Sequence, residues 1–203
     1  MQIRVSPTRM QLLRLRQRLA LARRGHKLLK DKLDGMIQQF FGIKNDYLKL
    51  HADLEPRLIE LFTQTTLASA LTPPQVMKET GSRQAMVSSE MKNIRGVRIP
   101  KYTLEVKGDL PDYSRLLASS EYTWSLNSFS EILPELIKLA GLNQALELIA
   151  REIIQTRRRV NALEFVLMPE LERNLKNIRM KLAELEHSSQ VVLLKIKDIV
   201  RAH

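Results

Sequence analysis

The stretch that decides the fold is LLRLRQRLALARRGHKLLKDKLDGMIQQFFGIKNDYLKLHADL, which runs from Leu12 to Leu54. Alternating steps of three and four residues define thirteen seam positions along it, and all except His26 are apolar. The positions are Leu12, Leu15, Leu19, Ala22, His26, Leu29, Leu33, Met36, Phe40, Ile43, Tyr47, Leu50 and Leu54. Because this repeat persists over six heptads, it predicts a coiled-coil helix that winds left-handedly around a partner helix.

A second seam of the same kind runs through the C-terminal part of the chain. Its positions are Leu146, Ile149, Ile153, Thr156, Val160, Leu163, Leu167, Leu171, Leu175, Ile178, Leu182, Leu185, Ser189, Val192, Ile196 and Ile199. From Leu163 to Leu175 it takes three consecutive steps of four, a stutter that locally relaxes left-handed winding. Pro169 lies inside the stutter and predicts a bend or a straightening there. The alternative is that Pro169 only separates two helices.

The two seams predict one antiparallel pair of helices. Ser6 and Pro7 suit the start of the first helix, Pro56 predicts a kink, and helical character is expected to fade by residues 72–74. A helix over residues 7–55 would be about 73 Å long, whereas a globule of this chain length would be about 45 Å across, so we expect an elongated protein. Since one helix cannot bury its own seam, we expect it to pair with the second, with both termini at one end. Pairing between molecules is the rival arrangement.

Residues 72–130 differ in composition and predict a small insertion between the helices. They hold four of the eight Pro and three of the seven Gly. Short β-like runs occur at 85–87, 97–99 and 102–106, and Pro100-Lys101 between the last two predicts the turn of a short hairpin. The predicted fold class is therefore all-α, a long antiparallel two-helix coiled coil with a small central insertion containing a short β-hairpin. Its segments are an N-terminal coiled-coil helix (1–71), the insertion (72–130) and a C-terminal coiled-coil helix (131–203).

The basic charge is concentrated at the start of the chain. The net charge is +11, and residues 1–32 carry ten basic side chains and a single acid, Asp31. A concentrated positive field favours a polyanionic or acidic partner, although a solvated helical face has the same pattern. The chain has no Cys and no long apolar run, which excludes a disulfide framework, a thiolate zinc site and a membrane-spanning helix.

No pattern typical of a catalytic or cofactor site occurs in the sequence. There is no phosphate-binding glycine loop, no metal-binding histidine pair and no serine nucleophile elbow. We therefore predict a protein that is not an enzyme and binds no cofactor or metal. His26 is interpreted as a polar register residue of the seam, and the acids Glu164, Glu170 and Glu172 as members of surface charge pairs.

Three further residues carry expectations about packing. Gly25 lies inside a predicted helix, where Gly costs about 1 kcal/mol relative to Ala. We expect another backbone to approach it closely, with a tolerated defect as the alternative. Trp124 and Phe129 are expected to anchor a small core, and their exposure would instead indicate a partner site.

Four segments resemble the D subunit of the vacuolar and archaeal-type rotary ATPases. Residues 6–10 (SPTRM) and 24–32 (RGHKLLKDK) are similar to the start of that family. Residues 158–164 (RRVNALE), followed by Pro169, Leu171 and Glu172, resemble its C-terminal signature. Residues 93–100 (NIRGVRIP) are similar to its central hairpin.

The resemblance implies the central rotor shaft of a V/A-type ATPase or ATP synthase. Such a shaft inserts into the hexamer of catalytic A and B subunits, pairs with the small F subunit of the rotor and docks on a funnel-shaped subunit above the membrane ring. Its rotation couples ATP hydrolysis or synthesis to proton or sodium transport, at the cytoplasmic side and peripheral to the membrane. The residues expected to contact the stator or the small rotor partner are Arg9, Arg24, Gly25, Lys27, Lys30, Arg158, Arg159 and Glu164.

Two other function classes fit the composition. A basic coiled coil could bind nucleic acid, but the first aromatic residue is Phe40, so the basic segment offers no base-stacking platform. Duplex phosphate binding would fall steeply with salt. The chain could also be a helical scaffold that dimerises.

Overall fold

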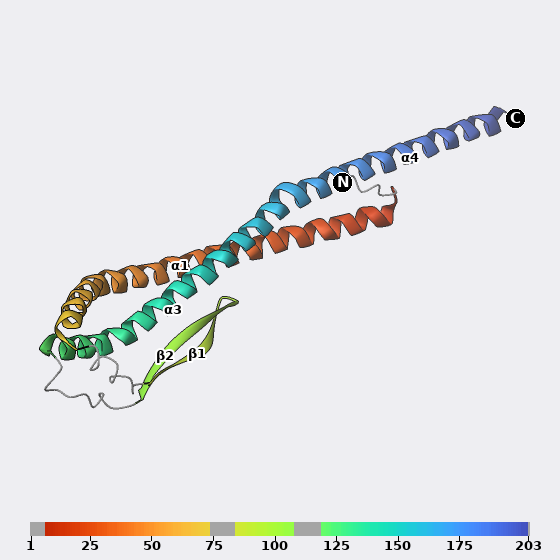
Figure 1. Cartoon of the computed structure of the whole chain (residues 1–203). Helices are drawn as coiled ribbons and strands as arrows, with labels where there is room; N and C mark the ends of the chain where they lie inside the picture. Colours follow the sequence, from red (N-terminus) through yellow and green to blue (C-terminus); the bar gives the residue numbers. More distant parts are fainter. Residues whose placement is uncertain (1–6, 74–83, 108–118, 203) are drawn as a thin grey trace. The chain divides into compact units, whose positions relative to one another are not determined.

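The computed structural model describes residues 7–73, 84–107 and 119–202. Its elements are α1 (Arg9–Leu71), β1 (Gln84–Ile94), β2 (Val97–Lys107), α3 (Ser120–Ala162), a π-helical turn η1 (Leu163–Leu167) and α4 (Met168–Ala202) (Figure 1). The chain divides into two compact units, unit 1 with Met1–Asp34 and Ile154–His203, and unit 2 with Gly35–Ile153. The predicted fold class, two long helical segments around a small antiparallel hairpin, is confirmed.

In unit 1, the first turns of α1 pack against α4 around a leucine-rich core. The buried residues are Leu15, Ala22, Leu171, Leu175 and Ile178. Two ion pairs show the direction of pairing, because Arg9 contacts Glu186 and Arg23 contacts Glu172, each at 2.7 Å. From Arg9 to Arg23 the chain advances fourteen residues along α1, while the paired acids go back fourteen residues along α4, from Glu186 to Glu172. The two helices are therefore antiparallel.

In unit 2, the rest of α1 packs against α3 in the same antiparallel sense. Leu54, Leu61 and Ile132 form its buried core. Arg57 Nη1 lies 2.7 Å from Glu135 Oε2, and the hydroxyls of Thr72 and Ser119 are 3.1 Å apart. Both units therefore pair the N-terminal helix with the C-terminal helical segment of the same chain, as expected. In unit 2, however, Ile132 lies before Leu146, the first position of the predicted second seam.

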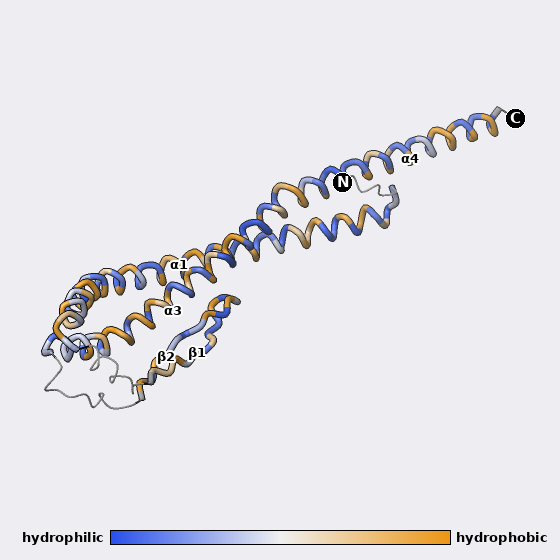
Figure 2. The backbone as a smooth tube through the Cα atoms, in the orientation of Figure 1, coloured by the Kyte–Doolittle hydropathy of each residue, from blue (hydrophilic) through white to orange (hydrophobic). Residues whose placement is uncertain are grey.

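All thirteen predicted seam positions of α1 are buried or half-buried. Figure 2 shows the corresponding alternation of apolar and polar stretches along the helices. Met36 and Leu54 are the most deeply covered of the set, with about 1 % of their surface exposed. The heptad pattern thus identifies the core-facing side of α1 correctly.

Helices α1 and α3 are each preceded by a residue whose side chain caps the first turn. Thr8, not Ser6, precedes the first turn of α1, and its Oγ1 accepts a hydrogen bond from the backbone N–H of Gln11 at 3.2 Å. The prediction that Pro7 opens the helix is wrong, and Ser6 lies outside the described residues. In α3, Ser119 Oγ accepts from the N–H of Tyr122 at 3.2 Å, so this helix begins at Ser120, earlier than residue 131.

The carboxyl group of Glu121 lies in the first turn of α3. Its pKa is lowered by a hydrogen bond from its own backbone N–H and, to a smaller extent, by one from Ser120. A carboxylate in that place is favoured by the unpaired N–H groups of the helix N-terminus. The interaction between the Glu121 carboxylate and these N–H groups therefore helps α3 to begin at Ser120.

The predicted stutter coincides with the π turn. The N–H of Met168 donates to the carbonyl of Leu163, five residues earlier. Pro169 follows directly, and α3, η1 and α4 succeed one another without interruption. The alternative that Pro169 separates two helices is therefore wrong. Since Pro has no N–H and crowds the preceding turn of an α-helix, the wider π turn is a suitable place for it.

The hairpin pairs β1 with β2 from Gln84↔Lys107 to Ile94↔Val97. Its two-residue turn is Arg95-Gly96, whose φ angles of 50° and 87° are both positive, as a type I′ turn requires. The Asn93 side-chain oxygen accepts a hydrogen bond from the Gly96 N–H at 2.8 Å. The prediction of a turn at Pro100-Lys101 is wrong. Pro100 lies inside β2, which is possible because both strands of a two-stranded sheet are edge strands.

Pro56 lies inside α1 without ending it. Beyond it, the hydroxyls of Thr63, Thr65 and Thr66 each donate to the carbonyl four residues earlier, at 2.7–2.8 Å. A missing N–H and such hydroxyl bonds both bend helices, and α1 curves in this part (Figure 1). Among the described residues, no helix is long and apolar enough to span a membrane.

Candidate functional site

All eight residues predicted to contact partners lie in unit 1. Seven of them are exposed, and Gly25 is half-buried. Two are engaged within the chain, because Arg9 pairs with Glu186 and Glu164 Oε2 lies 3.3 Å from His26 Nε2. The other charged members form no ion pair within the described part of the chain, namely Arg24, Lys27, Lys30, Arg158 and Arg159.

The expectation for Gly25 is wrong. A Cβ placed on this residue would meet nothing within 4 Å, so no other backbone among the described residues approaches it. That Gly25 contacts a partner stays a prediction. The expectation for the two aromatic residues is also wrong, because Trp124 and Phe129 are exposed rather than core anchors. Their exposure is the outcome that favours a partner site.

Glu164 and His26 connect the π turn to α1. The imidazole of His26 is mostly covered and the carboxylate of Glu164 is half-exposed. Glu172, on the first turns of α4, binds Arg23 at 2.7 Å. The interpretation of Glu172 as a member of a charge pair is thus confirmed. Glu164 has a contact to His26, which is an ion pair only when the imidazole is protonated. Glu170 forms no ion pair within the described residues. No group of three or more metal-binding side chains occurs in the described ranges.

Three large apolar side chains of the π turn are exposed. The prediction that Leu167 faces the core as a seam position is wrong, and the sequence analysis identified none of the three as a surface. They are Phe165, Val166 and Leu167. None of the five residues of η1 is buried. The signal that could have found them is the stutter, because an extra residue in the turn displaces its neighbours from the seam.

The second seam continues along α4 beyond the residues that face α1. Arg9, the first residue of α1, pairs with Glu186. Past that level the seam residues Val192, Ile196 and Ile199 are 50–55 % exposed. This part of α4 is therefore an amphipathic helix whose apolar side is not covered by any described part of α1.

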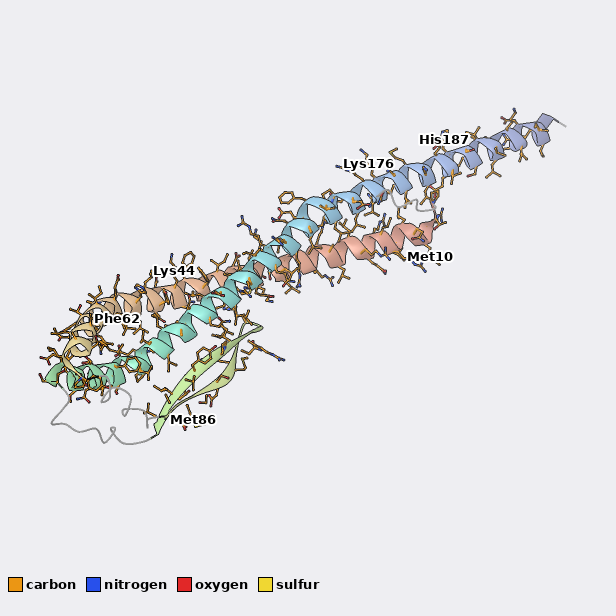
Figure 3. The ribbon with its side chains drawn as sticks, viewed as in Figure 1. Met10, Lys44, Phe62, Met86, Lys176 and His187 are labelled. Atoms are coloured by element: carbon orange, nitrogen blue, oxygen red, sulfur yellow. The ribbon has the colours of Figure 1, made fainter. Side chains whose placement is uncertain are left out.

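A third apolar surface lies along α1 in unit 2. Phe41, Leu48, Ile59 and Phe62 are all more than half exposed. Their spacings of 7, 11 and 3 residues place them on one side of the helix. Figure 3 shows the side chain of Phe62 in this part of α1. Apolar stripes of this kind are typical of protein contact surfaces.

The sequence matches a protein family along nearly its whole length. The family model for the D subunit of ATP synthase matches residues 11–198. The chain is 40 % identical to the D subunit of the V-type ATP synthase of Thermoanaerobacter sp. (strain X514), over 98 % of this chain and 97 % of that protein. It is 37 % identical to the protein of the same name from Fusobacterium nucleatum, with the same coverage, and 38 % identical to that of Clostridium botulinum, over 98 % and 96 %. The chain therefore belongs to the D-subunit family of ATP synthases.

Proposed function

We propose that the chain is the central-stalk subunit of a V/A-type rotary ATPase or ATP synthase. It couples ATP hydrolysis or synthesis in the catalytic hexamer to proton or sodium transport by rotation, and it is not itself catalytic. The observation that carries the proposal is the antiparallel pairing of α1 with the C-terminal segment in both units, in a chain of this family. A stalk that transmits torque needs two helices locked side by side, because a single helix twists easily.

The exposed surfaces supply contacts for the proposed partners. The apolar side of α4 around Val192 and the basic residues Lys27 and Lys30 suit insertion into the hexamer of A and B subunits. Long basic side chains make weak, exchangeable contacts with acidic loops, which permits a shaft to turn. The stripe that includes Phe41 and Phe62 suits the small F subunit of the rotor.

The remaining parts of the proposal concern the assembled enzyme. The chain docks on the funnel-shaped subunit above the membrane ring and works at the cytoplasmic side, peripheral to the membrane. Its partners do not include nucleic acid. The whole-length match to the D-subunit family supports these points.

The test is reconstitution with the A and B subunits of a V-type ATP synthase. We expect the chain to elute with the hexamer and to raise its ATPase rate. A variant with Val192→Gln, Ile196→Gln and Ile199→Gln should lose much of both effects. A control with Lys195→Gln and Asp198→Asn, on the same turns of α4, should keep them. A chain that neither elutes with nor stimulates any such hexamer, and binds duplex DNA in a salt-dependent way instead, would favour the nucleic-acid alternative.

A further inference from the structure

The described glycines that lie in helices fall into two kinds. A Cβ placed on Gly25 or Gly42 would meet nothing within 4 Å. A Cβ placed on Gly35 would lie 2.5 Å from Arg95 Nη1, and one on Gly141 would lie 3.3 Å from Tyr102 Cδ2. Both of the latter neighbours belong to the hairpin, one at its turn and one in β2. Gly35 of α1 and Gly141 of α3 are therefore the places where hairpin side chains lie directly on helix backbone.

The two strands of the hairpin differ in exposure. Every residue from Ala85 to Asn93 in β1 is exposed, including Met86 (Figure 3). In β2, by contrast, Val97, Ile99 and Pro100 are buried. A two-stranded ribbon cannot bury side chains on its own, so other parts of unit 2 cover β2. The hairpin thus presents β2 inward and β1 to the surroundings.

Arg95 occupies an unfavourable backbone position. Its φ of 50° lies in the left-handed region, where a side chain is unfavourable, and Asn or Gly is the usual residue of such a turn. A residue in a strained backbone conformation persists only when contacts with the surrounding structure compensate for the strain. The guanidinium group of Arg95 has that contact at Gly35.

We propose that the hairpin is a separable element held on the helical pair at two glycine seats, Gly35 under Arg95 and Gly141 under Tyr102. A side chain at either seat would displace the Arg95 guanidinium or the Tyr102 ring and thereby weaken the docking of the hairpin. Because an isolated two-stranded hairpin is marginally stable, undocking also loosens the β1–β2 ladder.

The experiment compares leucine at seat and non-seat glycines in the full-length chain. Leu favours helix over Gly at all four positions, so helix propensity does not distinguish the variants. Gly35→Leu and Gly141→Leu test the seats, and Gly25→Leu and Gly42→Leu are the matched controls. Since the chain has no Cys, spin labels at Glu90→Cys in β1 and Lys138→Cys in α3 report the distance from hairpin to helix specifically.

We expect the seat variants to lose the parental label-to-label distance and to exchange their β2 amides roughly tenfold faster or more. The controls should keep the parental distance and exchange rates. Circular dichroism shows whether each variant keeps its helices. If a seat variant fails to fold, Arg95→Asn and Tyr102→Ala test the same contacts from the hairpin side. Arg95→Asn removes the guanidinium group that lies on Gly35, and it should therefore undock the hairpin. This is expected even though Asn suits the turn better than Arg and relieves its strain. Parental distances in Arg95→Asn, or in both folded seat variants, would overturn the proposal.

Discussion

Deleting one residue from the π turn should leave the core of unit 1 intact, provided that Pro169 is also replaced. The twelve residue-to-residue steps from Leu163 to Leu175 would make about 3.3 turns of a regular α-helix, which would rotate Leu175 about a third of a turn off the seam. Because the π turn absorbs one residue, the other eleven make about three turns, and Leu171 and Leu175 stay buried. Deletion of Val166, an exposed residue of η1, removes that extra residue and keeps the same facing.

Pro169 sets the cost of this deletion. In the regular α-helix that results, its ring crowds the preceding turn and should cost about 3 kcal/mol. Deletion of Val166 alone is therefore expected to lower the free energy of unfolding by about that amount. Together with Pro169→Ala, the same deletion should leave it within about 1 kcal/mol of the parent. Urea unfolding followed by circular dichroism measures the difference.

The control is deletion of Asn177, an exposed residue of α4 in a regular α-helical stretch, again with Pro169→Ala. Removing one residue from a regular α-helix rotates the two sides of the deletion by about 100° relative to each other. Either Leu171 and Leu175 or Ile178 and Leu182 must then turn away from α1. Two large apolar side chains lost from the core should cost about 3–6 kcal/mol. If deleting Val166 with Pro169→Ala costs as much as deleting Asn177, the π turn does not hold the seam in phase and the reasoning is refuted.

Three smaller perturbations test the packing of the helices by urea or thermal unfolding. Leu54→Ala, at a residue only 1 % exposed, should cost about 2–5 kcal/mol, whereas Leu48→Ala on the outer side of α1 should cost under about 0.5 kcal/mol; equal losses would contradict the assigned core. Thr156→Val should stabilise the chain by about 1 kcal/mol, since the buried Thr156 hydroxyl has no hydrogen-bond partner in the described structure; a destabilisation would indicate a partner for it. Arg23→Ala should cost at most about 1 kcal/mol and less in high salt, because its ion pair with Glu172 is exposed; a loss unaffected by salt would show that packing dominates.

The helical pair could be predicted from the sequence because its physical cause is periodic. A seam residue such as Met36 or Leu54 is recognised by its place in a repeat, and the repeat is the condition for burial along a partner helix. The stutter was visible for the same reason. Its structural form, a π turn at residues 163–167, was not, because a stutter can also be absorbed by a change in supercoiling.

The hairpin was harder to place because its turn depends on backbone angles that the residue types do not reveal. Arg95-Gly96 resembles no common type I′ pair, whereas Pro100 is a strong turn signal that in this sheet lies within a strand. Glycine is ambiguous in the same way. The sequence alone cannot separate Gly25, which faces open space, from Gly35, which lies under Arg95, because the difference lies in a neighbour far along the chain.

The apolar surface at the end of α4 exists because the second seam continues beyond the point where α1 covers it. Residues Leu175 and Ile178 are buried against α1, and Val192, Ile196 and Ile199 continue the same seam past Glu186, where the described part of α1 has ended. These side chains are already about half covered, so covering the rest is worth about 0.7–1.5 kcal/mol each. A helix end that stays in solvent is not stabilised by a repeat of apolar residues. Exposed apolar stripes of this kind favour association with another protein. The end of α4 is therefore a part of the chain where a partner gains by binding, and this is consistent with the insertion into the hexamer that we propose above.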